Sequence, residues 1–324
     1  MSFLYWLEGL RNPVCDFIFS TITHIGEETI FLVVAILFFW CVNKREGYYI
    51  LITGLVGTVI NQAAKLIFKI PRPWIKDTNF TVVDGAKLEA TGYSFPSGHT
   101  QNVTGTFGAI GRYSKKRWVR IFSVAIIVLV AFSRMYLGVH TPLDVGVSLL
   151  IGILLVFGLY PCFEIKRDTT TVMPIIIFIS FLLSFGLLLF VFLMDREGVD
   201  PTNLYSGMKN ASTLFGCTLA LIPVYAVDKK LIDFPTEAKW YSQIIKLVLG
   251  LGGVLAIKAG LSSPLEALFG NEFIARGVRY FLIVIFAGII WPLTFRFFRR
   301  LRISPLDRFT EWLKGKTRKN KNEI

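Results

Sequence analysis

The sequence predicts an all-α, polytopic transmembrane helical bundle. Of its 324 residues, 53% are hydrophobic and only 18% are charged, whereas a soluble domain carries about 25% charged residues. The apolar residues also occur in runs of about 15 to 22, long enough for a helix to cross a bilayer core of roughly 30 Å. This composition argues against a disordered chain, a nucleic-acid-binding domain and an ordinary soluble enzyme.

Nine apolar segments are expected to form the helices of this bundle. The third is short and rich in Gly and Thr, so we expect it inside the bundle, where small residues allow close helix contacts. Residues 3–22 precede the first segment, and their apolar residues recur at helical spacing, interrupted by Asn12-Pro13. That spacing predicts a helix along the membrane interface. The nine segments run near 28–42, 48–68, 99–112, 118–134, 141–160, 172–194, 210–227, 241–260 and 277–297.

Basic residues predict the orientation of the chain. The net charge is +13, and in membrane proteins such an excess collects in cytoplasmic loops. If the nine segments alternate, one side receives 22 of the 35 Lys and Arg residues and the other receives seven. We therefore expect a cytoplasmic C-terminus, an extracytoplasmic N-terminus and no nucleic-acid partner. The basic tail, with Trp312 and Leu313, is expected on anionic lipid headgroups or in solvent as a stop-transfer tail.

The four cysteines show no CxxC spacing, so we expect neither a disulfide framework nor a zinc site. Charged and histidine residues within or beside the apolar segments are more informative, because such residues are costly in a membrane and usually functional. The predicted topology places six of them on one membrane face, at the outer ends of their helices. They are Lys65, Arg72, His99, Arg134, His140 and Asp144.

This residue set suits phosphate chemistry. Three fixed cations match a dianionic oxyanion, and the two arginines offer forked donors. Pro96-Ser97-Gly98 stands before a helix, where backbone N–H groups and the Ser97 hydroxyl can bind an anion. His140 and Asp144 are spaced i, i+4, which on a helix places them on one face. The carboxylate could then hold one imidazole nitrogen and leave the other free to attack, while His99 protonates a leaving group.

Three segments resemble the signature motifs of the type 2 phosphatidic acid phosphatase superfamily, which also includes the vanadium haloperoxidases. The resemblance implies that His140 is the nucleophile that forms a phosphohistidine and that Asp144 orients it. It implies that His99 protonates the leaving oxygen and then activates water, without a metal or other cofactor. Phosphoryl oxygens would be bound by Lys65, Arg72, Arg134, Ser97 and Gly98. The matching positions are Lys65, Arg72 and Pro73, then Pro96, Ser97, Gly98 and His99, then Ser133, Arg134, His140 and Asp144.

The apolar segments, the charge distribution and the resemblance together divide the chain into four parts. Residues 1–27 are expected to be an interfacial segment, and residues 28–194 a six-helix phosphatase core. Residues 195–298 would form about three additional transmembrane helices of unknown role, and residues 299–324 a basic cytoplasmic tail. Loop 73–98, with Trp74 and Phe80, is expected to roof the site and to help select the headgroup.

These features predict a metal-independent membrane phosphatase with lipid phosphates as substrates and membrane lipids as neighbours. Candidate substrates are phosphatidic acid, sphingoid-base phosphates and polyprenyl phosphates or pyrophosphates. Three alternatives share the same residues: an anionic-lipid transporter or flippase, a phosphotransferase and a haloperoxidase. A metal bound by His140 and Asp144 would need a third ligand that the sequence does not indicate. The oligomeric state stays open.

Overall fold

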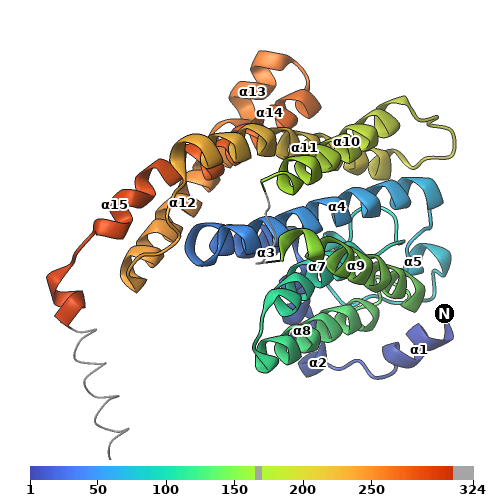
Figure 1. Ribbon diagram of the computed structural model, residues 1–324. Coiled ribbons are helices and arrows are strands. Elements are labelled where there is room, and N and C mark those ends of the chain that lie inside the picture. The colour runs from blue at the N-terminus through green and yellow to red at the C-terminus, as the bar shows by residue number, and fades with distance from the viewer. Residues whose placement is uncertain (165–169, 309–324) are drawn as a thin grey trace, which may run out of the picture.

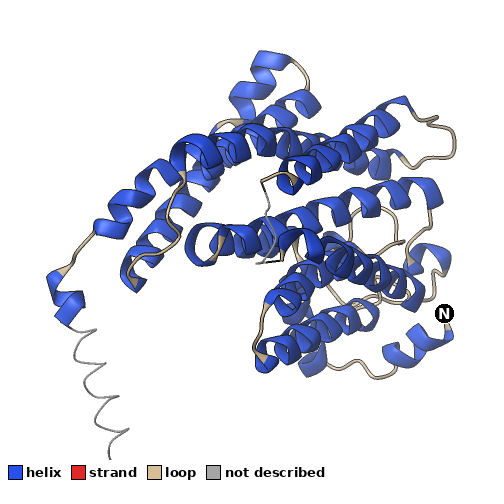
Figure 2. Cartoon of the chain, viewed as in Figure 1, coloured by secondary structure: helices blue, strands red, loops and turns tan. Residues whose placement is uncertain are grey.

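The computed structural model describes residues 1–164 and 170–308. Within these ranges the chain forms helices and loops without a strand (Figure 2). The all-α prediction is therefore confirmed. The expected tail residues Trp312 and Leu313 lie outside the described residues.

Seven helices in the described part of the chain are long and apolar enough to cross a membrane. An eighth span results if the two halves of a bent helix near the N-terminus are counted as one. The first half is α2 (Pro13–Thr23) with η1 (His24–Gly26), and the second is α3 (Glu28–Leu37) with η2 (Phe38–Val42). The two halves are bent by 53° relative to each other. The first six of the seven contain α4 (Lys44–Phe68), α8 (Arg117–Tyr136), α9 (Pro142–Phe163), α10 (Val172–Leu193), α11 (Pro201–Val227) and α12 (Trp240–Gly260). The seventh, Glu272–Arg300, begins with the shorter α14 (Glu272–Ile285) and continues through further helical turns.

Two of the nine expected segments are too short to span alone. Helix α3 has 10 residues and α7 (Gly98–Tyr113) has 16. As predicted from its small residues, α7 lies inside the bundle, packed against α4, α8 and α9. Its Gly105 approaches Gly54 of α4 closely, since an added Cβ would lie 3.7 Å from the Gly54 Cα.

The N-terminal segment is broken where the sequence predicts it. Helix α1 (Ser2–Glu8) ends before Asn12, whose side chain caps α2 by accepting from the Cys15 N–H at 3.0 Å. Pro13 takes the first position of α2, where its missing N–H costs nothing. Both α1 and α2 pack on α8.

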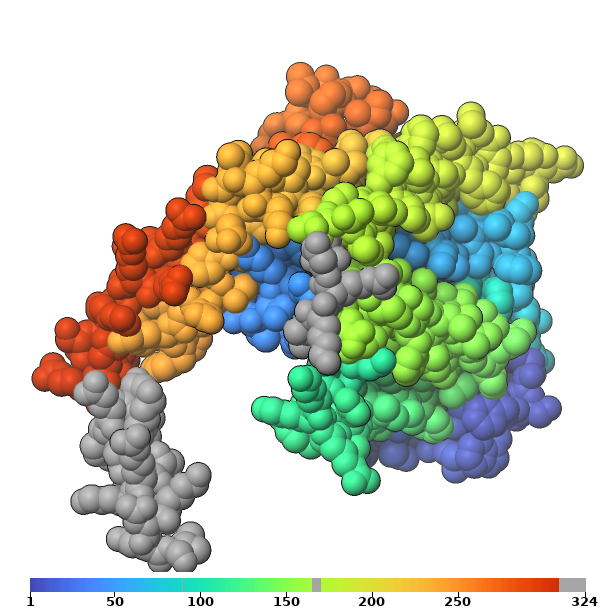
Figure 3. Space-filling model, in the orientation of Figure 1, coloured from blue at the N-terminus to red at the C-terminus, as the bar shows by residue number. Residues whose placement is uncertain are grey.

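Helix α4 is the centre of the molecule (Figure 1). It contacts α7 and α9 on one side and α10 and α11 on the other. The C-terminal helices α12 and α14, with α13 (Ser262–Phe269) and α15 (Phe295–Arg300), arch away from α8, as the orange-to-red surface in Figure 3 shows. Buried Trp40 joins them to the rest of the chain, because its indole N–H donates to the Ala287 carbonyl at 2.8 Å.

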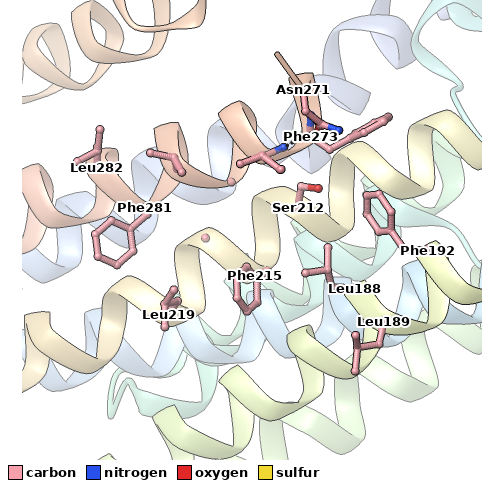
Figure 4. Close-up of a pocket in the computed structure, with 14 residues that line it drawn as sticks. Leu188, Leu189, Phe192, Ser212, Phe215, Leu219, Asn271, Phe273, Phe281 and Leu282 are labelled. Atoms are coloured by element: carbon pink, nitrogen blue, oxygen red, sulfur yellow. Dashed lines mark hydrogen bonds between the residues drawn. The ribbon is translucent and has the colours of Figure 1, made fainter. Parts of the chain in front are cut away.

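An apolar cavity of about 750 Å³ lies between α10, α11 and α14 (Figure 4). Phe192, Phe215 and Phe281 line it, with Ser212 and Asn271 among the few polar groups. Beside it α11 and α14 cross so closely that a Cβ on Gly216 would lie 2.1 Å from the Gly277 carbonyl oxygen. Only glycine fits that crossing.

Candidate active site

Helix direction gathers the candidate residues at one end of the bundle. Helices α4 and α8 finish at the end where α7 and α9 begin, so the last turns of the first pair meet the first turns of the second. The Ser97 N–H donates to the Asp144 carbonyl at 3.2 Å and joins the starts of α7 and α9. Six side chains at this end lie within electrostatic reach of one another and are called here the cationic cup: Lys65, Arg72, His99, Arg134, His140 and Asp144.

Arg72 is fixed by backbone oxygens. It precedes the short helix α5 (Pro73–Lys76) and donates to the carbonyls of Thr91, Gly92 and Val139 at 2.8 to 3.0 Å. Its Nη1 also lies 2.9 Å from His140 Nε2. A guanidinium can only donate, so Nε2 accepts and carries the lone pair. The proton of neutral His140 is therefore on Nδ1, the nitrogen that faces Asp144.

Asp144 lies beside His140, but the local structure differs from the prediction. We expected both residues on one helix face, whereas α9 begins at Pro142 and His140 belongs to the preceding turn. Thr141 caps the helix, and its backbone N–H donates to Asp144 Oδ2 at 2.8 Å in a capping box. The separation of His140 Nδ1 and Asp144 Oδ2 is 3.5 Å, which is long for a hydrogen bond. The carboxylate thus faces the imidazole through the cap geometry.

Lys65 and Arg134 are both almost completely buried and hydrogen-bonded to neutral oxygens. The Lys65 ammonium donates to the Tyr93 carbonyl, and Arg134 Nη1 donates to Thr23 Oγ1 at 2.6 Å. The acceptors of these two hydrogen bonds are neutral, so they orient the cations without adding a negative charge. A buried positive charge attracts an anion strongly, because little water screens it.

The electrostatics of the cup act on His140. Burial lowers the pKa of the His140 imidazole well below its usual range, and the charges of Arg72, Arg134 and Lys65 lower it further. His140 is therefore neutral near pH 7. His99 lies within electrostatic reach of the same three cations, and its buried Nε2 has no hydrogen-bond partner among the described residues.

Comparison with known proteins identifies the family. Residues 45–168 match the model of the PAP2 superfamily, and residues 209–303 match that of the PAP2 superfamily phosphatase transmembrane extension. The chain is 33% identical over 160 residues to undecaprenyl-diphosphatase BcrC of Bacillus subtilis, covering 48% of this chain and 79% of that protein. The chain belongs to the PAP2 superfamily.

Other similar proteins act on different lipids. Phosphatidylglycerophosphatase B of Bacillus subtilis is 29% identical over 163 residues, which is 46% of this chain and 75% of that protein. Human sphingosine-1-phosphate phosphatase 2 is 26% identical over 158 residues, covering 47% and 39%. No solved structure matches the chain significantly. This PAP2 protein is therefore a multi-pass membrane hydrolase of the lipid phosphatase class.

In this PAP2 phosphatase, Ser97 and Gly98 occupy the start of α7. The buried Ser97 hydroxyl caps the helix by accepting from the Thr100 N–H and hydroxyl, at 3.4 and 3.0 Å. Gly98 is the first helical residue, and a Cβ there would be 3.9 Å from Asn61 Oδ1. The protein itself thus leaves room for a side chain at Gly98, so any need for glycine there would have to come from a bound ligand.

The expected roof of the site is only partly found. The ring of Trp74 lies 5.9 Å from the Arg72 guanidinium carbon, at the edge of the cup. Phe80 is buried instead against α1, with Leu4 and Leu7. Loop 73–98 contributes to the cup mainly through backbone carbonyls, which orient Arg72 and Lys65.

Sequence reasoning missed three residues that hold the cup. Ser94 Oγ donates to Asp144 Oδ2 at 2.6 Å, Thr23 accepts from Arg134, and Thr141 caps α9. The pattern Thr141-Pro142-x-Asp144 is a capping-box sequence and could have revealed Thr141. Ser94 and Thr23 carry no such local signal. In the ranges that the structure describes, no group of three His, Cys, Asp or Glu side chains could hold a metal ion.

Proposed function

We propose that this protein hydrolyses a lipid phosphomonoester or pyrophosphate through a phosphohistidine on His140. The observation that supports this most directly is the hydrogen bond from Arg72 to His140 Nε2. It leaves Nδ1–H toward Asp144 and a lone pair on the nitrogen that faces the cations. A neutral imidazole with that tautomer is a competent nucleophile.

In the first step, His140 Nε2 attacks phosphorus while the bond from phosphorus to the leaving oxygen breaks. His99 carries a proton in this step, because the bound phosphate dianion offsets the charges of the three cations around it, and it gives this proton to that oxygen. The imidazolium that forms at His140 is stabilised by Asp144, which Ser94 and the Thr141 N–H hold in place. In the second step, His99 takes a proton from water, the water oxygen attacks phosphorus, and the phosphorus–nitrogen bond breaks to release inorganic phosphate.

Lys65, Arg72 and Arg134 would bind the phosphoryl oxygens, with the Ser97 hydroxyl and the Gly98 N–H. Arg72 would exchange its contact with His140 for one with phosphate. These cations supply the charge stabilisation that a metal ion provides in other phosphoryl-transfer sites. We therefore expect activity without an added divalent metal.

The site is proposed to face the extracytoplasmic side, with a cytoplasmic C-terminus, because the basic loops fall on the opposite side. A lipid could then place its headgroup in the cup at the helix ends while its chain stays in the bilayer. Residues 28–194 would provide the chemistry, residues 195–298 would pack beside them, and the interfacial segment 1–27 would support α8.

Trapping of the intermediate tests the proposal. Purified full-length protein in detergent, with EDTA, is mixed with a ³²P-labelled lipid phosphate and quenched in alkali. We expect an alkali-stable, acid-labile phosphoenzyme and release of inorganic phosphate, both absent from His140→Ala. Phosphate release by His140→Ala, or activity that requires Mg²⁺, would reject the mechanism. Transfer of the label to another alcohol in place of water would identify a phosphotransferase.

A further inference from the structure

A polar hollow adjoins the cationic cup. It holds about 30 Å³ and lies between α4, the backbone of Thr91–Tyr93 and the first half of α11. Helix α11 lies outside the residues that match the three motifs, so this pocket joins two parts of the chain. Its polar side chains are Gln62 and Lys65 from α4, Thr91 from the loop, and Asn203, Ser206 and Asn210 from α11.

Helix α11 is held against this pocket by specific contacts. Positions 203, 206 and 210 are three and four residues apart and so share one helix face. Gly207 lets that face approach α4, because a Cβ there would lie 2.8 Å from Leu66 Cδ1. The Asp200 N–H donates to the Tyr93 hydroxyl at 3.1 Å, which ties the start of α11 to the pocket wall.

The pocket shares its wall with the cup. Lys65 lines the pocket and donates to the Tyr93 carbonyl. Arg72 donates to the carbonyls of Thr91 and Gly92. The same three-residue backbone thus orients two cup cations on one side and borders the pocket on the other. Lys65 joins the two sites, because its side chain lines the pocket and lies within electrostatic reach of Arg72 and Arg134 in the cup. A lipid headgroup with its phosphate in the cup would therefore bring its neighbouring atoms close to this pocket.

The lining selects a particular chemistry. It offers amides, hydroxyls and one ammonium group, and no carboxylate occurs among the described residues that line it. The half-buried side chains of Gln62, Asn203 and Asn210 have no hydrogen-bond partner within residues 1–164 and 170–308. Such donors suit an oxygen-rich or anionic group, whereas Lys65 would repel an amine cation. The volume admits about two groups of water size, which fits oxygens and not a ring.

We propose that this pocket is a headgroup subsite for the oxygens next to the scissile phosphate, supplied by the lipid-side phosphate of a diphosphate. The subsite makes the enzyme favour lipid diphosphates over amine-bearing sphingoid-base phosphates. It also assigns a role to α11, which carries three of its polar side chains. The inference rests on the proposed function, because it takes the cup as the site of the scissile phosphate.

Matched substrates test the subsite. Phosphate release by the purified full-length protein is measured with farnesyl diphosphate, farnesyl phosphate and sphinganine phosphate. Asn210→Leu and Asn203→Leu remove amide contacts to a charged group. We expect kcat/KM for the diphosphate to fall about tenfold, mainly through KM. The values for the two monophosphates should change by less than about threefold. Thr202→Leu, an exposed position of α11 outside the pocket, is the control and should leave all three unchanged.

Asn210→Asp keeps the size of the side chain and adds a carboxylate. It should weaken the diphosphate and improve sphinganine phosphate, a reversal that general destabilisation cannot produce. Equal losses on all three substrates, or none on the diphosphate, would overturn the subsite while leaving the mechanism intact. Absence of phosphate release from every substrate with the unaltered protein would instead reject the proposed function.

Discussion

The cationic cup and the apolar cavity beside Gly216 both lie between helices, but they are built in opposite ways. The cup forms where helices begin and end, and backbone carbonyls and caps hold its charged side chains. The cavity forms along the middle of α10, α11 and α14, where apolar side chains and a glycine crossing set the spacing. Helix ends supply free backbone groups that can orient polar side chains, whereas helix middles supply none.

The difference predicts how each region responds to change. A substitution in the cup should reduce activity and leave the fold intact, because its side chains contribute charge. A substitution at the α11–α14 crossing should reduce stability, because the two backbones approach so closely there that no side chain fits between them.

The largest effect on activity is expected for Arg134→Lys. Lysine keeps the charge but loses the fork, so contacts to Thr23 and to a phosphoryl oxygen cannot both form. We expect kcat/KM to fall by about 10²- to 10³-fold, the cost of removing one transition-state donor. The thermal midpoint in detergent should stay within a few degrees of that of the unaltered protein. Near-normal activity would remove Arg134 from the phosphate ligands.

A smaller effect, on stability alone, is expected for Gly216→Ala. The added Cβ would meet the Gly277 carbonyl at 2.1 Å, so α11 and α14 must separate, at a cost of about 1 to 3 kcal/mol. Thermal denaturation should show a lower midpoint. Gly186→Ala on α10 is the matched control, since a Cβ there meets nothing within 4 Å; it should be neutral or stabilising. Equal behaviour of the two variants would contradict the tight crossing.

The two regions also differ in how much the sequence reveals of them. The length and composition of the apolar runs predict the long helices, and the three motifs predict which residues meet in the cup. The capping box at Thr141 can be found in the sequence, but the i, i+4 spacing of His140 and Asp144 predicts that both lie on one helix, whereas α9 begins only at Pro142. Hydropathy counts apolar residues and does not show where a helix begins.

Tertiary contacts explain what the sequence did not predict. Ser94 and Thr23 reach the cup from segments 50 and 111 residues away from their partners, and no spacing rule connects such positions. Phe80 is expected over the site because it belongs to loop 73–98, yet it is buried with Leu4 and Leu7 of α1. The α11 face with Asn203 and Asn210 resembles any polar helix surface until Gly207 brings it against α4.

Ser94→Ala should have a moderate effect on activity. It removes the hydroxyl that donates to Asp144 Oδ2 and leaves the Thr141 contact in place. The loss of one hydrogen bond to a charged group predicts about a tenfold fall in kcat. Ser94→Thr, which restores a hydroxyl, should recover part of it. A rise in KM without a change in kcat would show that Ser94 contacts the substrate and does not position Asp144.

The smallest effect is a shift in the pH dependence of kcat/KM. This shift depends on the charges of the cup and not on its shape. The pKa of His140 is lowered, so the neutral nucleophile persists below pH 6.5 and is lost only as the pH falls through the lowered pKa. The acid limb of kcat/KM, which reports groups of the free enzyme, should therefore lie below pH 6.5. Arg72→Gln removes one charge that lowers this pKa, so the remaining activity should show an acid limb shifted to higher pH. Ser94→Ala, which changes no charge, should leave the limb in place. A shift of the Arg72→Gln limb to lower pH would mean that another group than His140 controls it.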